Sequence, residues 1–124
     1  MADLHGPLEG DALLDAVTEA MSALHQRYYH RAPGTTTSRM MGPDLLACVL
    51  GGVYTDVEQT LIEIERGPAV ENNRNAFQIA MQDRFIGAVE RLSGRQVIHF
   101  VSTHNIGPDL EVELFFFDDP PPEG

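Results

Sequence analysis

The chain has 124 residues, which fits one domain built around one hydrophobic core. Its 19 acidic and 8 basic residues give a formal net charge of −11, and all the basic residues are arginine. This balance argues against binding to nucleic-acid phosphates or to an anionic lipid surface, because both would repel the chain. A basic protein partner is still compatible with it.

The two ends of the chain differ in composition from the part between them. Residues 1–10 contain two glycines and a proline and predict a flexible leader, and residues 119–124 form an acidic, proline-rich tail. The folded domain is expected over residues 11–118. The N-terminus has neither the basic nor the apolar region of a targeting signal, and no apolar run approaches the length of a membrane helix. We therefore expect a cytoplasmic protein without direct membrane insertion, peripheral to a membrane only through a partner.

The first predicted element is a helix over residues 11–29, because apolar residues recur three and four apart. Pro33 and Gly34 end it. Two strands are predicted over 35–41 and 45–50, separated by a Gly-Pro-Asp turn. The lone cysteine, Cys48, lies in the second, nearly all-apolar strand, so we expect a buried, inert thiol and a reducing compartment. The residues of the predicted helical stripe are Leu14, Val17, Met21, Leu24 and Tyr28.

Two helices are predicted in the middle of the chain. Thr55 and Glu58 have the spacing of a capping box, which predicts a short helix to about residue 65. After Gly67-Pro68 a long helix is expected to Leu92, with Gly94 as its left-handed cap. The apolar stripe of this helix carries Arg74 on it or beside it.

A hairpin of residues 96–103 and 110–117 completes the predicted elements. Leu110, Val112, Leu114 and Phe116 alternate with two glutamates and two phenylalanines, which predicts that Phe115 and Phe117 face away from the helices. The order α-β-β-α-α-β-β predicts one α+β domain with a mostly antiparallel four-stranded sheet and helices packed on one face. The other face is too apolar to stay in water, so a homodimer interface or a covering helix is expected.

The chain lacks the common catalytic motifs, and we expect no enzyme activity, no cofactor and no metal site. His104 and Asp109 flank the turn of the last hairpin and could approach one another across it to shuttle a proton, but two ligands alone do not make a metal site. Arg31, Arg74 and Arg95 are the other candidates for binding a partner or an anion, since guanidinium groups bind carboxylates in bidentate fashion. For Arg74 the structural alternative is a pair with Glu58 or Glu90.

The chain carries five short motifs in sequence: residues 28–33, 50–61, 74–78, 89–97 and the hairpin that starts at Pro108-Asp109. Their residues and their order are similar to those of the MpsC (YbcI-like) family. This chain resembles the family over about residues 13–118. The resemblance implies a bacterial component of a sodium-translocating, membrane-potential-generating system linked to inorganic-carbon uptake, with no catalytic residues to transfer. His30 and Ala32 stand where the family has glycines beside Arg31, and Tyr54 where it has leucine.

Two functions from different classes follow from these observations. The first is a non-enzymatic accessory or regulatory protein that acts as a homodimer through protein contacts, with a membrane transporter subunit as partner. The alternative is a dimeric sensor of a small molecule or an anion, unrelated to transport, with its ligand between helix and sheet.

Overall fold

A computed structural model describes residues 6–118 of the chain. The elements follow the predicted order, and their bounds lie close to the predicted ones. Residues 1–5 of the predicted leader and all of the predicted tail, 119–124, lie outside the described residues. The elements are α1 (Gly10–Tyr29), β1 (Thr35–Met40), β2 (Leu45–Gly51), α2 (Asp56–Glu63), α3 (Gly67–Ser93), β3 (Val97–Asn105) and β4 (Leu110–Phe117).

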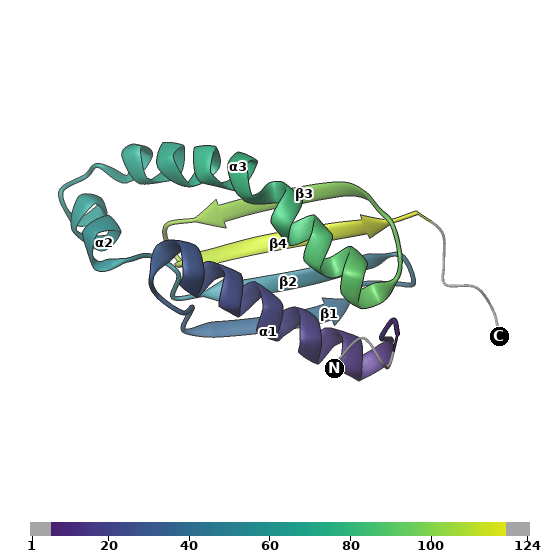
Figure 1. Cartoon of the computed structure of the whole chain (residues 1–124). Coiled ribbons are helices and arrows are strands. Elements are labelled where there is room, and N and C mark those ends of the chain that lie inside the picture. The colour runs from purple at the N-terminus through teal and green to yellow at the C-terminus, as the bar shows by residue number, and fades with distance from the viewer. Residues whose placement is uncertain (1–5, 119–124) are drawn as a thin grey trace.

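The four strands form one antiparallel sheet in the order β1-β2-β4-β3. Figure 1 shows α1 and α3 on the same face of this sheet, with α2 beyond its end beside the first turns of α3. α1 packs on β1 and β2, and α3 packs on β3. The predicted α+β fold, with an antiparallel sheet and helices on one face, is confirmed.

The core lies between the two long helices and the sheet. In α1 every fourth residue from Leu13 to His25 is buried, so the stripe lies close to the predicted one. In β2, Leu46, Cys48 and Leu50 point at the helices, and Leu45, Ala47 and Val49 are only half-buried on the other face. Cys48 is fully buried as predicted, and burial raises the pKa of its thiol to about 11.

The predicted orientation of β4 is wrong. Phe115 and Phe117 face the helices, together with Glu111 and Glu113, and all four are at most 2 % exposed. The leucines and Val112 of the strand, and Phe116, point to the uncovered face instead. A strand that alternates between two faces can be turned over as a whole, and here α3 supplies polar partners for the glutamates.

The predicted end structures of the helices are confirmed. Thr55 and Glu58 form the capping box at the start of α2, and Gly94 adopts φ +68° at the end of α3. His30 ends α1 in a left-handed conformation with φ 59°, which histidine tolerates better than most side chains. Within residues 6–118 no helix is both long and apolar enough to cross a lipid bilayer.

Candidate functional site

A cluster of polar side chains fills the space between α1, α3 and the sheet, next to α2. We call it the Arg74 cluster. Its residues are His25 of α1, Glu58 of α2, Arg74 and Gln78 of α3, Ser102 of β3, and Glu111 and Glu113 of β4.

Arg74 is the centre of the cluster and is 1 % exposed. Its Nε and Nη2 donate to the two carboxylate oxygens of Glu58 at 2.7 and 2.6 Å, which is a bidentate pair. Nη2 also donates to the carbonyl of Val53 at 2.7 Å, and Nη1 donates to Glu111 Oε1 at 3.3 Å. The guanidinium lies 3.9 Å from the ring centre of Tyr29. The predicted pair with Glu58 is therefore present, and Arg74 is not exposed to a partner.

His25 connects Arg74 to the loop after α1. Its Nδ1 lies 2.7 Å from the carbonyl oxygen of Arg31, and because a carbonyl only accepts, Nδ1 carries the proton. Nε2 is then an acceptor, and Arg74 Nη1 donates to it at 3.3 Å. Burial lowers the pKa of His25, which favours this neutral form. The backbone of Arg31 is thus fixed to the cluster, while its side chain is exposed.

Glu111 and Glu113 lie on the same face of β4 because they are two residues apart. The side-chain amide of Gln78 donates to Glu113 Oε1 at 2.7 Å and lies 3.3 Å from Glu111 Oε2. Burial, and then the neighbouring Glu111 carboxyl, raise the pKa of Glu113 well above its usual range. Glu113 therefore holds a proton more firmly than an exposed glutamate does.

Two further predicted residues lie at the same end of the sheet. One carboxylate oxygen of Asp109 accepts from the backbone N–H of Val53 at 2.9 Å, and the other lies 3.5 Å from the backbone nitrogen of Tyr54. Asp109 thus holds the backbone of Val53, whose carbonyl accepts from Arg74. His104 is paired in register with Glu111, on the helix side, and its buried Nδ1 has no hydrogen-bond partner among the described residues.

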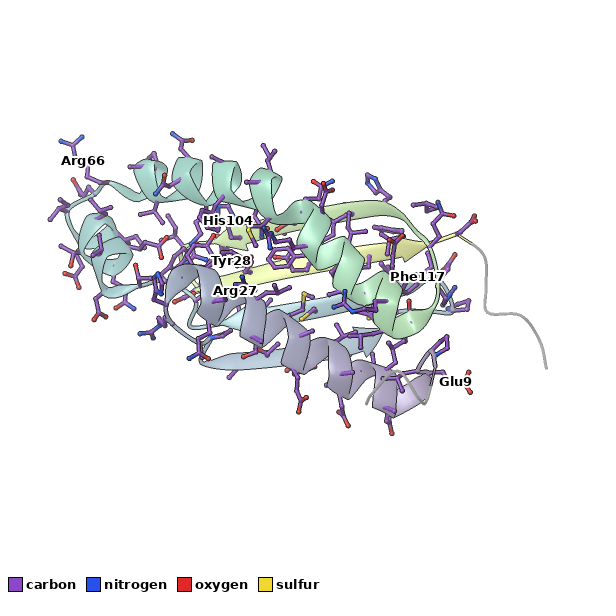
Figure 2. All side chains as sticks on the ribbon, viewed as in Figure 1. Glu9, Arg27, Tyr28, Arg66, His104 and Phe117 are labelled. Carbon is purple, nitrogen blue, oxygen red and sulfur yellow. The ribbon has the colours of Figure 1, made fainter. Side chains whose placement is uncertain are left out.

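Arg95 lies at the opposite end of the sheet from the other four predicted residues. Its guanidinium donates to the carbonyl of Pro43 at 2.8 Å and lies 4.3 Å from the ring centre of Phe117. Figure 2 shows His104 toward the α2 end and Phe117 toward the other end. Arg95 thus supports the β1–β2 turn and is not part of the Arg74 cluster.

Sequence reasoning missed five members of the cluster: His25, Gln78, Ser102, Glu111 and Glu113. The alternation of glutamates with apolar residues in β4 is typical of a strand with its acids in water. Gln78 is the signal that favours buried glutamates instead, because it follows Arg74 by four residues and so lies on the same face of α3. A buried helix face with two polar residues requires polar partners on the element that it covers.

The chemistry open to this cluster is charge recognition and proton exchange. Within the described part of the chain there is no group of three or more His, Cys, Asp or Glu residues placed to hold a metal ion. The glutamates are aligned by Arg74 and Gln78, which are hydrogen-bond donors to them. The cluster therefore resembles a buried ion-pair network more than a site with an aligned nucleophile.

Comparison with known proteins gives one match. A family model described as "Na+-translocating membrane potential-generating system (MpsC)" matches residues 11–119, which is nearly the whole chain. No curated protein and no solved structure matches the chain.

Proposed function

This chain belongs to the MpsC family, and we propose that it is a non-enzymatic accessory or regulatory component of a sodium-translocating, membrane-potential-generating system. In this proposal it lies in the cytoplasm and acts by binding a membrane subunit of that system. The family match over residues 11–119 is the observation that carries the proposal, because it covers the whole folded domain. The link to inorganic-carbon uptake belongs to the same proposal.

The loop that follows α1 is the best-supported contact for a partner. His30 ends α1 in a left-handed conformation, and the hydrogen bond from His25 fixes the carbonyl of Arg31. The loop therefore presents the exposed Arg31 side chain from a fixed backbone. A guanidinium held in this way can bind a carboxylate of a partner with little loss of backbone entropy.

The uncovered face of the sheet supports a homodimer, the second part of the proposal. Strand residues on this face include Arg39 and His99, and none of those described carries a carboxylate, although the chain has 19 acidic residues. Two copies with a net charge of −11 repel one another, and this face is where their carboxylates interfere least. Its apolar, half-buried residues are Leu45, Ala47, Val49, Val101, Leu110, Val112, Leu114 and Phe116.

Affinity capture from the native cell, with the membrane fraction kept, tests the accessory function. We expect wild-type protein to capture a membrane subunit of a sodium-translocating system and to release it as salt is raised, since exposed charge contacts are screened. Arg31→Glu should lose this subunit. Arg91→Glu, which reverses an exposed charge near the end of α3, is the matched control and should retain it.

Two results would contradict the proposal at different levels. Capture that is equal for wild type and Arg31→Glu would exclude the loop as the contact and leave the accessory function standing. Failure of the wild-type protein to capture any membrane subunit at low salt would overturn the accessory function itself.

A further inference from the structure

A groove lies between α3 and the edge strand β3, next to the Arg74 cluster. It has a volume of about 220 Å³, and two of its residues, Gln78 and Ser102, belong to the Arg74 cluster. We call it the Gln78 groove. Its residues are Asn75, Gln78, Ile79 and Gln82 of α3 and Phe100 and Ser102 of β3.

The Arg74 cluster carries more negative than positive charge. Glu58, Glu111 and Glu113 are three carboxyl groups, and among the described residues Arg74 is the one guanidinium bonded to them. His25 is neutral in the tautomer that its contacts require. Even with one proton shared between Glu111 and Glu113, the two remaining negative charges share the single positive charge of Arg74. A buried excess of negative charge favours a cation that can reach it.

Two oxygen atoms of the Arg74 cluster lack hydrogen-bond partners within residues 6–118. Oε1 of Gln78 and Oε2 of Glu113 are buried and have no hydrogen-bond partner among the described residues. Gln78 is 8 % exposed and Glu113 is 1 % exposed, so neither side chain is solvated like a surface group. The amide oxygen of Gln78 can only accept, so what it lacks is a hydrogen-bond donor.

The residues that line the groove indicate which class of ligand it can bind. Phe100 offers an aromatic ring, which attracts an ammonium or a guanidinium group and also packs against an alkyl chain. The amides of Asn75 and Gln82 add acceptors at its mouth, while the partly apolar lining suits more than a bare, fully hydrated ion. From this geometry we propose that the Gln78 groove binds a protonated amine or guanidinium group on a short alkyl stem.

Such a group has two sources: a free small amine, or a lysine or arginine side chain of a partner. The second source rests on the proposed function and gives the acidic protein a specific contact with a basic segment of its membrane partner. The binding chemistry is the same in both cases. The donor bonds to the carbonyl oxygen of Gln78, and its charge offsets that of Glu111 and Glu113.

Thermal unfolding with small probes tests the groove without any partner. Agmatine and butylamine, as their chloride salts, are compared with sodium chloride at equal ionic strength and with neutral butanol. A probe that binds the folded state at about ten times its Kd should raise Tm by roughly 3 °C or more. We expect this rise with both amines and not with sodium chloride or butanol. In addition, the side-chain amide NMR signals of Gln78 should shift.

Glu113→Gln is the decisive variant, because it keeps the shape of the side chain and removes the carboxyl group that can give up a proton when a cation binds. It should fold and lose most of the response to the amines. Glu71→Gln, on the exposed side of α3, should keep the full response. No rise in Tm with either amine, an equal rise with sodium, or an unchanged response in Glu113→Gln would each overturn the proposal.

The source of the group is decided on the captured complex. If agmatine at constant ionic strength releases the membrane subunit, a basic side chain of the partner occupies the groove. If the probes bind and the complex persists, the ligand is a free amine. A complex that forms normally while the isolated protein ignores the probes would overturn the groove proposal and leave the proposed function intact. Binding of the probes to a protein that captures no membrane subunit would support the groove proposal and overturn the proposed function.

Discussion

Arg74 of α3 and Glu58 of α2 form a bidentate ion pair in which the arginine side chain is fully buried and the glutamate is 13 % exposed. The pair joins a short helix outside the sheet to the long helix that covers it. Glu58 also accepts from the backbone N–H of Thr55 in the capping box, so the same carboxylate caps the N-terminus of α2 and binds Arg74. Helix capping and the buried charge are therefore coupled in this protein.

Removal of Arg74 should be strongly destabilising. Arg74→Met keeps most of the volume but leaves Glu58 and Glu111 without their cation, and losing one partner of a buried pair costs about 3–5 kcal/mol. Arg74→Lys keeps the charge and loses the bidentate geometry, so it should cost less. Urea unfolding followed by circular dichroism measures both values. A loss below about 1 kcal/mol for Arg74→Met would mean that the cluster contributes little to folding.

The contribution of His25 to the stability of the protein should be lost as the pH drops below about 6.5. The unfolded chain ionises this histidine near pH 6.5, whereas the folded chain ionises it only at lower pH, so acid favours the unfolded state. The groups that contact or influence the ring are the Arg31 carbonyl, the Tyr29 ring, Arg74, Glu58 and Glu111.

The variant His25→Gln isolates this contribution. A glutamine amide can donate to the Arg31 carbonyl and accept from Arg74, but it does not titrate. The free energy of unfolding, measured by urea titration between pH 7.5 and 5.5, should fall less in this variant than in the wild type. The same slope in both proteins would assign the acid sensitivity to other groups.

Much of the fold could be predicted from the sequence, and most of the site could not. Element order and ends follow from local signals: the capping box at Thr55, the glycine after α3 and the alternation in β4. The orientation of β4 does not follow from local signals, because period-two alternation allows either face of the strand to be buried. Arg74 and Gln78, which lie on another element, decide between the two orientations. Arg95 was grouped with Arg74 as a candidate by residue type alone, and it lies at the other end of the sheet.

Glu113 should have the opposite pH dependence to His25. Its pKa in the folded chain lies well above the value of 4.5 in an unfolded chain, so its contribution is fully present below pH 4.5 and is lost as the pH rises toward the folded value. The groups around it are Glu111 on the same strand, Gln78 and Arg74 on α3, Ser102 on β3, and Cys48 opposite it on β2.

Glu113→Gln should therefore flatten the decline in stability between pH 5 and pH 9, because the glutamine stays neutral throughout. Glu63→Gln, at the exposed end of α2, should leave the wild-type profile unchanged. Urea unfolding at several pH values measures both profiles. If Glu113→Gln is as sensitive to alkali as the wild type, Glu113 is ionised in the folded protein and the proton lies elsewhere in the cluster.

The uncovered face of the sheet should be the dimer interface. Leu114 is near its centre, between Ala47 of β2 and Val101 of β3 in the register. Leu114→Asp places one carboxylate per copy in a face that otherwise lacks them, and the two copies then bury opposed like charges. We expect the dimer to dissociate at micromolar concentration while the circular dichroism spectrum stays unchanged, since Leu114 is only half-buried within one copy.

Light scattering coupled to size-exclusion chromatography measures the mass of each variant. Val57→Asp is the matched control, because Val57 is a 71 % exposed apolar residue on α2, away from this face. It should remain a dimer. A wild-type chain that elutes with the mass of a monomer at every concentration would exclude the homodimer, and the apolar face would then be assigned to the membrane partner. A dimer that survives Leu114→Asp would instead place the contact between two copies on the helices.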